Sequence, residues 1–91
     1  MKILSPWIQL EKEKIQYGCG NTFRRSLIGT EYGGLLIWDT KEVIRRWRAT
    51  PTYSRHDELS DAQNYCDQYA MANGFTLINN MKEFQKLSIL L

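Results

Sequence analysis

Residues 41–55 hold the densest set of side chains that could bind an anion. The segment reads KEVIRRWRATPTYSR and contains five cations against one anion, whereas the whole chain of 91 residues has a net charge of only +2. Clustered guanidinium groups create a local potential that attracts anions, and each group can pair with a carboxylate or a phosphate through two hydrogen bonds. The charges that follow are acidic until Lys82, namely Asp57, Glu58, Asp61 and Asp67. The sequence therefore predicts a surface with a basic side.

Six arginines, which we call the basic patch, are the predicted binding residues: Arg24, Arg25, Arg45, Arg46, Arg48 and Arg55. Trp47 and Tyr53 lie among them and could stack on the bases of a nucleic acid. The same residues also have a purely structural interpretation, in which Trp47 belongs to the core and the arginines only keep a sheet edge solvated.

Two classes of partner match the basic patch. One is a protein with an acidic surface, and the other is a nucleic acid that offers its phosphates. The near-neutral net charge and the acidic second half of the chain favour the protein. We therefore predict a small non-enzymatic binding module, such as an adaptor, inhibitor or regulator, with a nucleic-acid-binding accessory protein as the alternative.

Residues suited to nucleophilic or metal chemistry are few and poorly spaced. Cys19, His56 and Cys66 lack the paired local spacing of a zinc site. Cys19, His56 and Asp57 could form a nucleophile and base, but nothing in their spacing brings them together. The stretch 18–20, Gly-Cys-Gly, lacks the third glycine and the lysine of a phosphate-binding loop. We therefore expect no enzyme activity, no metal and no cofactor.

A second candidate surface lies at the C-terminal end of the chain. Residues 81–91 follow a helical pattern whose apolar stripe is Met81, Phe84, Leu87 and Leu91. Ile89 and Leu90 fall outside that stripe and are candidates for an apolar contact with a partner, unless the tip of the helix simply frays. We expect a monomer or a weak homodimer.

The N-terminal half has strand patterns separated by glycines. Residues 8–10, 22–28 and 35–39 are strand candidates, and the glycines of 29–34 predict a turn. Residues 40–50 allow two interpretations. Val43, Ile44 and Trp47 have helical spacing, whereas a strand running back from a turn at 39–40 would give residues 35–39 a nearby partner.

The C-terminal half predicts helices. Leu59, Ala62, Cys66 and Tyr69 follow helical spacing, with Ser60 and Gln63 as a possible capping box. Residues 73–75, Asn-Gly-Phe, predict the end of this helix, and a short strand follows at 75–78. Asn80 and Glu83 then predict the start of the final helix.

These elements predict an α+β fold in a single domain that spans residues 1–91. An antiparallel meander of three or four strands would be packed by one long amphipathic helix at about 58–73, with a short helix at the C-terminus. No apolar run predicts a signal peptide or a membrane span, so a cytoplasmic protein that does not contact a membrane is expected. The predicted core is Ile8, Leu10, Phe23, Leu27, Leu36, Trp38, Trp47, Leu59, Ala62, Cys66, Tyr69 and Phe84.

Overall fold

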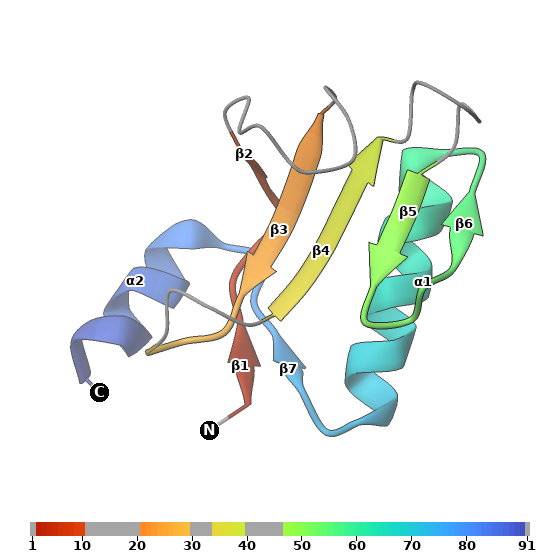
Figure 1. Ribbon diagram of the computed structural model, residues 1–91. Coiled ribbons are helices and arrows are strands. Elements are labelled where there is room, and N and C mark those ends of the chain that lie inside the picture. Colours follow the sequence, from red (N-terminus) through yellow and green to blue (C-terminus); the bar gives the residue numbers. More distant parts are fainter. Residues whose placement is uncertain (1, 11–20, 30–33, 40–46, 91) are drawn as a thin grey trace.

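Two layers make up the fold, a five-stranded antiparallel sheet and a helix that packs on one of its faces (Figure 1). The computed structural model describes residues 2–10, 21–29, 34–39 and 47–90, with the backbone alone at 38 and 39. The chain order is β1 (Ile3–Leu4), β2 (Ile8–Leu10), β3 (Thr22–Ser26), β4 (Gly34–Asp39), β5 (Trp47–Thr50), β6 (Arg55–His56), α1 (Leu59–Ala72), β7 (Thr76–Leu77) and α2 (Met81–Leu90). The predicted α+β class is confirmed.

Strands β2 to β6 form the sheet in sequence order, with every neighbouring pair antiparallel. The sheet has one strand more than the three or four predicted, because β6 pairs with β5 beyond the expected end of the meander. Of the two interpretations of 40–50, the strand is confirmed for Trp47–Thr50, which pairs with β4. Residues 40–46 lie outside the described part of the chain.

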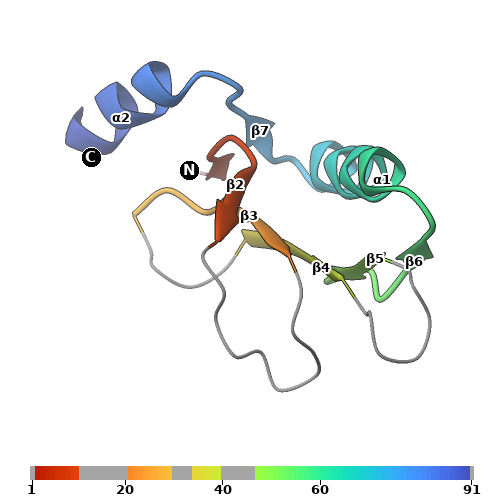
Figure 2. The same cartoon turned by 90° about the horizontal axis from the view of Figure 1, so that it is seen from above.

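A separate pair of strands joins the N-terminal segment to the segment between α1 and α2. Strand β1 runs parallel to β7, with Ile3 opposite Thr76 and Leu4 opposite Leu77. The Ser5 N–H donates to the Ser26 carbonyl over 2.9 Å, which ties this pair to the end of β3. Figure 2 shows β1, β7 and α1 on the same side of the five-stranded sheet. The predicted short strand at 75–78 therefore exists, with a parallel partner.

Helix α1 presents small side chains to the sheet. Ala62, Cys66 and Ala70, spaced four residues apart, are fully buried. They pack in one cluster with Leu4, Leu35, Ile37 and Ala49. Small residues at this contact let the helix backbone approach the sheet closely. Tyr69, which we predicted in the core, is 38% exposed because the buried stripe follows Ala70 instead.

The ends of both helices largely follow their sequence signals. Helix α1 stops where Gly74 adopts a φ of +83°, and the Phe75 N–H turns back to the Ala70 carbonyl over 2.9 Å. At the start of α2, the Asn80 side chain accepts a hydrogen bond from the Lys82 N–H over 2.9 Å. The predicted Ser60 capping box is wrong, since α1 begins at Leu59 with Glu58 as its N-cap and without a side-chain cap.

The core prediction is partly wrong, because some strand residues were assigned to the wrong face of the sheet. On β4, Leu35 and Ile37 are buried, and Leu36 lies at the alternate position with partial exposure. Ile8 is 38% exposed, while Ala62 and Cys66 are buried as predicted. Phe84 packs, with Leu87, on a second cluster of Ile3, Ile28 and Ile78. The remaining predicted core side chains are half-buried where described: Leu10, Phe23, Leu27, Trp47 and Leu59.

Candidate binding face

The strand register divides the side chains of the sheet between two faces. Successive residues of a strand project to opposite faces, and directly opposed residues of neighbouring strands share a face. Leu35, Ile37 and Ala49 pack against α1 and therefore define the helix face. The alternate positions make up what we call the open face. Neither described helix lies on that side of the sheet in Figure 2.

Three arginines of the basic patch occupy the open face. Arg24 lies between Ile8 and Leu36 in one row of opposed residues, which continues to Thr50. In the next row, Arg48 of β5 lies directly opposite Arg55 of β6. The Arg55 side chain is exposed and those of Arg24 and Arg48 are half-buried, so all three reach the surface.

Arginines provide all of the charge at the described strand positions of the open face. The remaining positions whose side chains are described are occupied by aliphatic, small or hydroxyl residues: Ile8, Leu10, Thr22, Ser26, Gly34, Leu36 and Thr50. Acidic residues gather elsewhere, with Glu58 and Asp61 exposed at the start of α1. The open face is thus a basic surface with aliphatic residues interspersed, and it lies on the opposite side of the sheet from the helix layer.

Arg25 does not belong to this face, which corrects its assignment to the basic patch. Its side chain is only 3% exposed and forms an ion pair with Asp67 of α1, with 2.9 Å between Nε and Oδ1. Arg25 lies opposite Leu35 in the ladder, on the helix face. Adjacent residues of a strand project to opposite sides, so Arg24 and Arg25 cannot share a binding surface. Arg45 and Arg46 lie outside the described residues.

The two rings proposed for stacking lie in different environments. Trp47 projects to the helix face, where it packs against the core and contacts Phe23 edge to face with 5.8 Å between ring centroids. This position removes it from the open face. Tyr53, in the turn between β5 and β6, is 71% exposed and has a φ of +55°.

Of the groups considered for nucleophilic or metal chemistry, Cys66 and His56 lie in the described part of the chain. Cys66 is fully buried, and burial, followed by the nearby Asp67 charge, raises the pKa of its thiol to about 11. A thiol in this state is a poor nucleophile at neutral pH. His56 hydrogen-bonds to the Ser54 hydroxyl over 2.7 Å, and Cys19 lies outside the described residues. Within those residues, no group of three His, Cys, Asp or Glu side chains could hold a metal.

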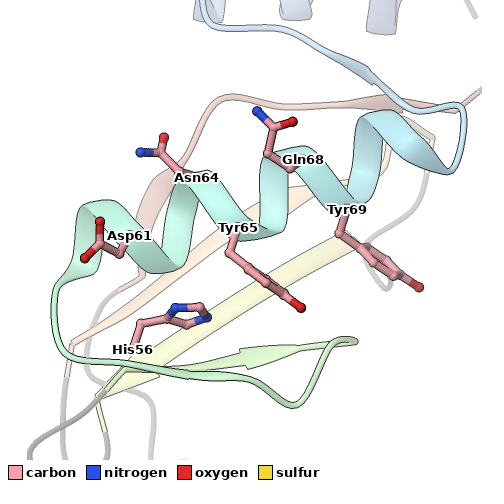
Figure 3. A pocket seen from close by; sticks show the side chains of 6 residues that line it. All are labelled: His56, Asp61, Asn64, Tyr65, Gln68 and Tyr69. Atoms are coloured by element: carbon pink, nitrogen blue, oxygen red, sulfur yellow. The ribbon is translucent and has the colours of Figure 1, made fainter.

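A groove of about 540 Å³ runs along the flank of α1 beside β6 (Figure 3). Its lining residues are His56, Asp61, Asn64, Tyr65, Gln68 and Tyr69. The His56 and Tyr65 rings lie 5.0 Å apart. We did not predict this site from the sequence, because Tyr69 was assigned to the core. The signal in the sequence is the four-residue spacing of Asp61, Tyr65 and Tyr69, which places all three on one flank of a helix.

The final helix leaves its predicted apolar residues exposed. Ile89 and Leu90 are 84% and 80% exposed, whereas Phe84 and Leu87 pack against the second apolar cluster. Among the described residues, no helix is long and apolar enough to cross a membrane. Comparisons with family models, with curated proteins and with solved structures found no match to this chain.

Proposed function

We propose that this chain is a small non-enzymatic binding module whose open face docks on an acidic surface of a protein partner. One observation carries the proposal: every charged residue at the described positions of the open face is an arginine. Arg24, Arg48 and Arg55 project together from three strands, and guanidinium groups bind the carboxylates of an acidic surface through paired hydrogen bonds.

Aliphatic side chains beside the arginines favour a protein over a nucleic acid. Ile8 and Leu36 flank Arg24 on the same row, so the face mixes apolar contact area with charge, as protein interfaces do. Single-stranded nucleic acids are bound chiefly by exposed rings on which their bases stack. Of the two candidate rings, Trp47 lies on the helix face and Tyr53 in a turn beside the sheet.

The test compares two double variants that remove the same charge from different places. Arg24→Gln with Arg55→Gln removes two of the three charges of the open face, and Lys82→Gln with Lys86→Gln removes two exposed lysines of α2. A protein partner captured from nuclease-treated lysate is first purified, and its affinity for each variant is then measured. We expect the arginine variant to lower both the association rate and the affinity at least tenfold, because charges at the rim of an interface speed the diffusional encounter of the two proteins. The lysine variant should bind the partner with nearly the affinity of wild type.

The nucleic-acid alternative is an outcome of the same experiment. Fluorescence polarisation with duplex DNA, single-stranded DNA and RNA is recorded at two salt concentrations. Tight binding with a log–log salt slope near −0.9 per phosphate contact on duplex DNA, abolished by the arginine variant, would replace the protein partner with a nucleic acid. Equal binding of the protein partner by both double variants would overturn the proposal for the open face.

A further inference from the structure

The groove beside α1 has a composition unlike that of the open face. Two tyrosines and one histidine provide ring surface, and Asp61, Asn64 and Gln68 provide polar groups. Asp61 is the only charged residue in the lining, and neither it nor the nearby Glu58 has a side-chain partner among the described residues. Arg55 is next to His56 in the chain but projects to the open face with Arg48. The groove is therefore aromatic and acidic.

Ring faces on the same helix flank as a carboxylate match a cationic side chain. A guanidinium or ammonium group is attracted to the negative face of an aromatic ring, most strongly where the contact is shielded from water. Tyr65 and Tyr69 are 51% and 38% exposed, and both side chains point toward the β5–β6 hairpin in Figure 3. One helical turn separates each of Asp61, Tyr65 and Tyr69 from the next, about 6 Å along the axis. An extended cationic side chain spans that distance.

The neighbouring sheet edge offers backbone hydrogen bonds to an extended ligand. Of the described strands, β6 is the outermost on this side. The Ala49 N–H donates to the Ser54 carbonyl over 3.0 Å, and Arg55 is the next residue along the edge. In an antiparallel ladder the hydrogen-bonded pairs alternate, so the N–H and C=O of Arg55 point away from β5. A peptide laid along this edge would pair with these two groups, as in recognition by strand addition.

We propose that the groove between α1 and β6 binds an extended basic peptide segment, with lysine or arginine side chains on the rings of Tyr65 and Tyr69, the one on Tyr65 having its charge directed to Asp61. The site is separate from the open face and has the opposite charge preference. Its volume of about 540 Å³ lies within the usual range for ligand sites, which is roughly 300–1,000 Å³. Such a module would contact an acidic partner with one surface and a basic segment with another.

The test uses an acetylated, amidated octapeptide in which arginine alternates with valine or threonine, and a matched peptide with glutamate in place of arginine. Binding is followed by the amide shifts of the labelled protein. We expect the arginine peptide to shift the Arg55, His56, Tyr65 and Tyr69 amides and the glutamate peptide to leave them unchanged. No binding of the arginine peptide, or equal shifts with both peptides, would overturn the proposal.

Variants separate the cation site from simple apolar contact. Tyr65→Leu and Tyr69→Leu keep apolar bulk on the helix but remove the ring faces, and Asp61→Asn removes the charge. Each tyrosine variant is expected to weaken binding of the arginine peptide about twofold to fivefold, which is the usual contribution of one cation–π contact at an exposed site, and Asp61→Asn should also weaken it because the counter-charge is lost. Lys82→Gln on α2, which removes an exposed charge away from both proposed surfaces, is the control and should leave the affinity unchanged. Unchanged affinity in all three groove variants, with their fold confirmed by circular dichroism, would also overturn the proposal.

Discussion

Arg25 and Asp67 form a two-pronged ion pair between β3 and α1. The guanidinium Nε donates to Asp67 Oδ1 over 2.9 Å, and Nη2 donates to Oδ2 over 3.2 Å. Nη1 of Arg25 donates to the backbone carbonyls of Ser5 and Ile78 over 2.9 and 3.1 Å, and Nη2 also donates to Asn79 Oδ1 over 3.0 Å. The indole of Trp7 also donates to Asp67 Oδ1 over 3.1 Å. One largely buried charge pair thus connects the sheet, the helix and the residues that follow β1 and β7.

Asp67→Asn should strongly destabilise the protein. The substitution keeps the shape of the side chain but leaves the guanidinium of Arg25, which is 3% exposed, without its counter-charge. Removing one partner of a buried ion pair typically costs about 3–5 kcal/mol. Urea unfolding measures the loss, and Asp61→Asn, an exposed acid of the same helix, is the control that should stay within about 0.5 kcal/mol of wild type. Similar midpoints for the two variants would contradict the structural role of the pair.

Arg25 also shows where prediction of the site from sequence alone reaches its limit. Alternation requires Arg24 and Arg25 to project to opposite faces, but charge alone cannot say which of the two is buried. The deciding partner, Asp67, is 42 residues away in the chain. The fold class was predictable, because the helix signals at 59–75 and the glycine-bounded strands come from local pattern. Long-range pairing, such as that of β1 with β7, has no local signal.

The phase of β4 can be tested with two alanine substitutions. Ile37 is fully buried against α1, whereas Leu36 lies on the open face with partial exposure. We expect Ile37→Ala to cost about 2–5 kcal/mol, since it leaves a cavity in the core, and Leu36→Ala to cost clearly less. The apolar run from Leu35 to Trp38 has no alternation, so the sequence does not identify its buried face. A larger loss of stability for Leu36→Ala in urea unfolding would reverse the two faces.

Gly34 should not tolerate a side chain. Its φ is +116°, and a Cβ atom added there would overlap the carbonyl oxygen of Arg25 on the neighbouring strand. Gly74 provides a matched comparison, because its φ is +83° and nothing lies within 4 Å of an added Cβ. We expect Gly74→Ala to cost only the strain of a left-handed backbone, about 1 kcal/mol, and Gly34→Ala to cost considerably more. The measurement is the midpoint of thermal unfolding. Equal decreases in this midpoint for both variants would contradict the close contact between β3 and β4.

The groove beside α1 was hidden from the sequence for a physical reason. Tyr65 and Tyr69 continue the apolar pattern of the helix, and large rings are normally read as core. The helix instead packs through Ala62, Cys66 and Ala70, whose small size brings α1 close to the sheet. The tyrosines then lie on its flank beside β6, where their rings are partly exposed. Whether a ring belongs to the core or to a site depends here on the size of its neighbours.

Cys66 should make the stability of the protein depend on alkaline pH. Burial raises the pKa of its thiol from 9.0 to about 11. Below pH 9 the thiol is protonated in both the folded and the unfolded chain, so stability is unaffected. Between pH 9 and 11 the unfolded chain releases the proton and the folded chain retains it, which lowers the free energy of unfolding by up to about 1.4 kcal/mol per pH unit.

The contribution of Cys66 is isolated by comparing wild type with Cys66→Ala in urea unfolding at pH 8.5 and 10.5. Lysine and tyrosine titration affects both proteins alike, so only the difference between them reports the buried thiol. We expect wild type to lose roughly 2 kcal/mol more than the variant over this interval. Cys66→Asp should be much less stable than Cys66→Ala already at neutral pH, because it places an unpaired charge in the core beside Asp67. Parallel pH curves for wild type and Cys66→Ala, together with a mild effect of Cys66→Asp, would mean that this face of α1 is not buried against the sheet.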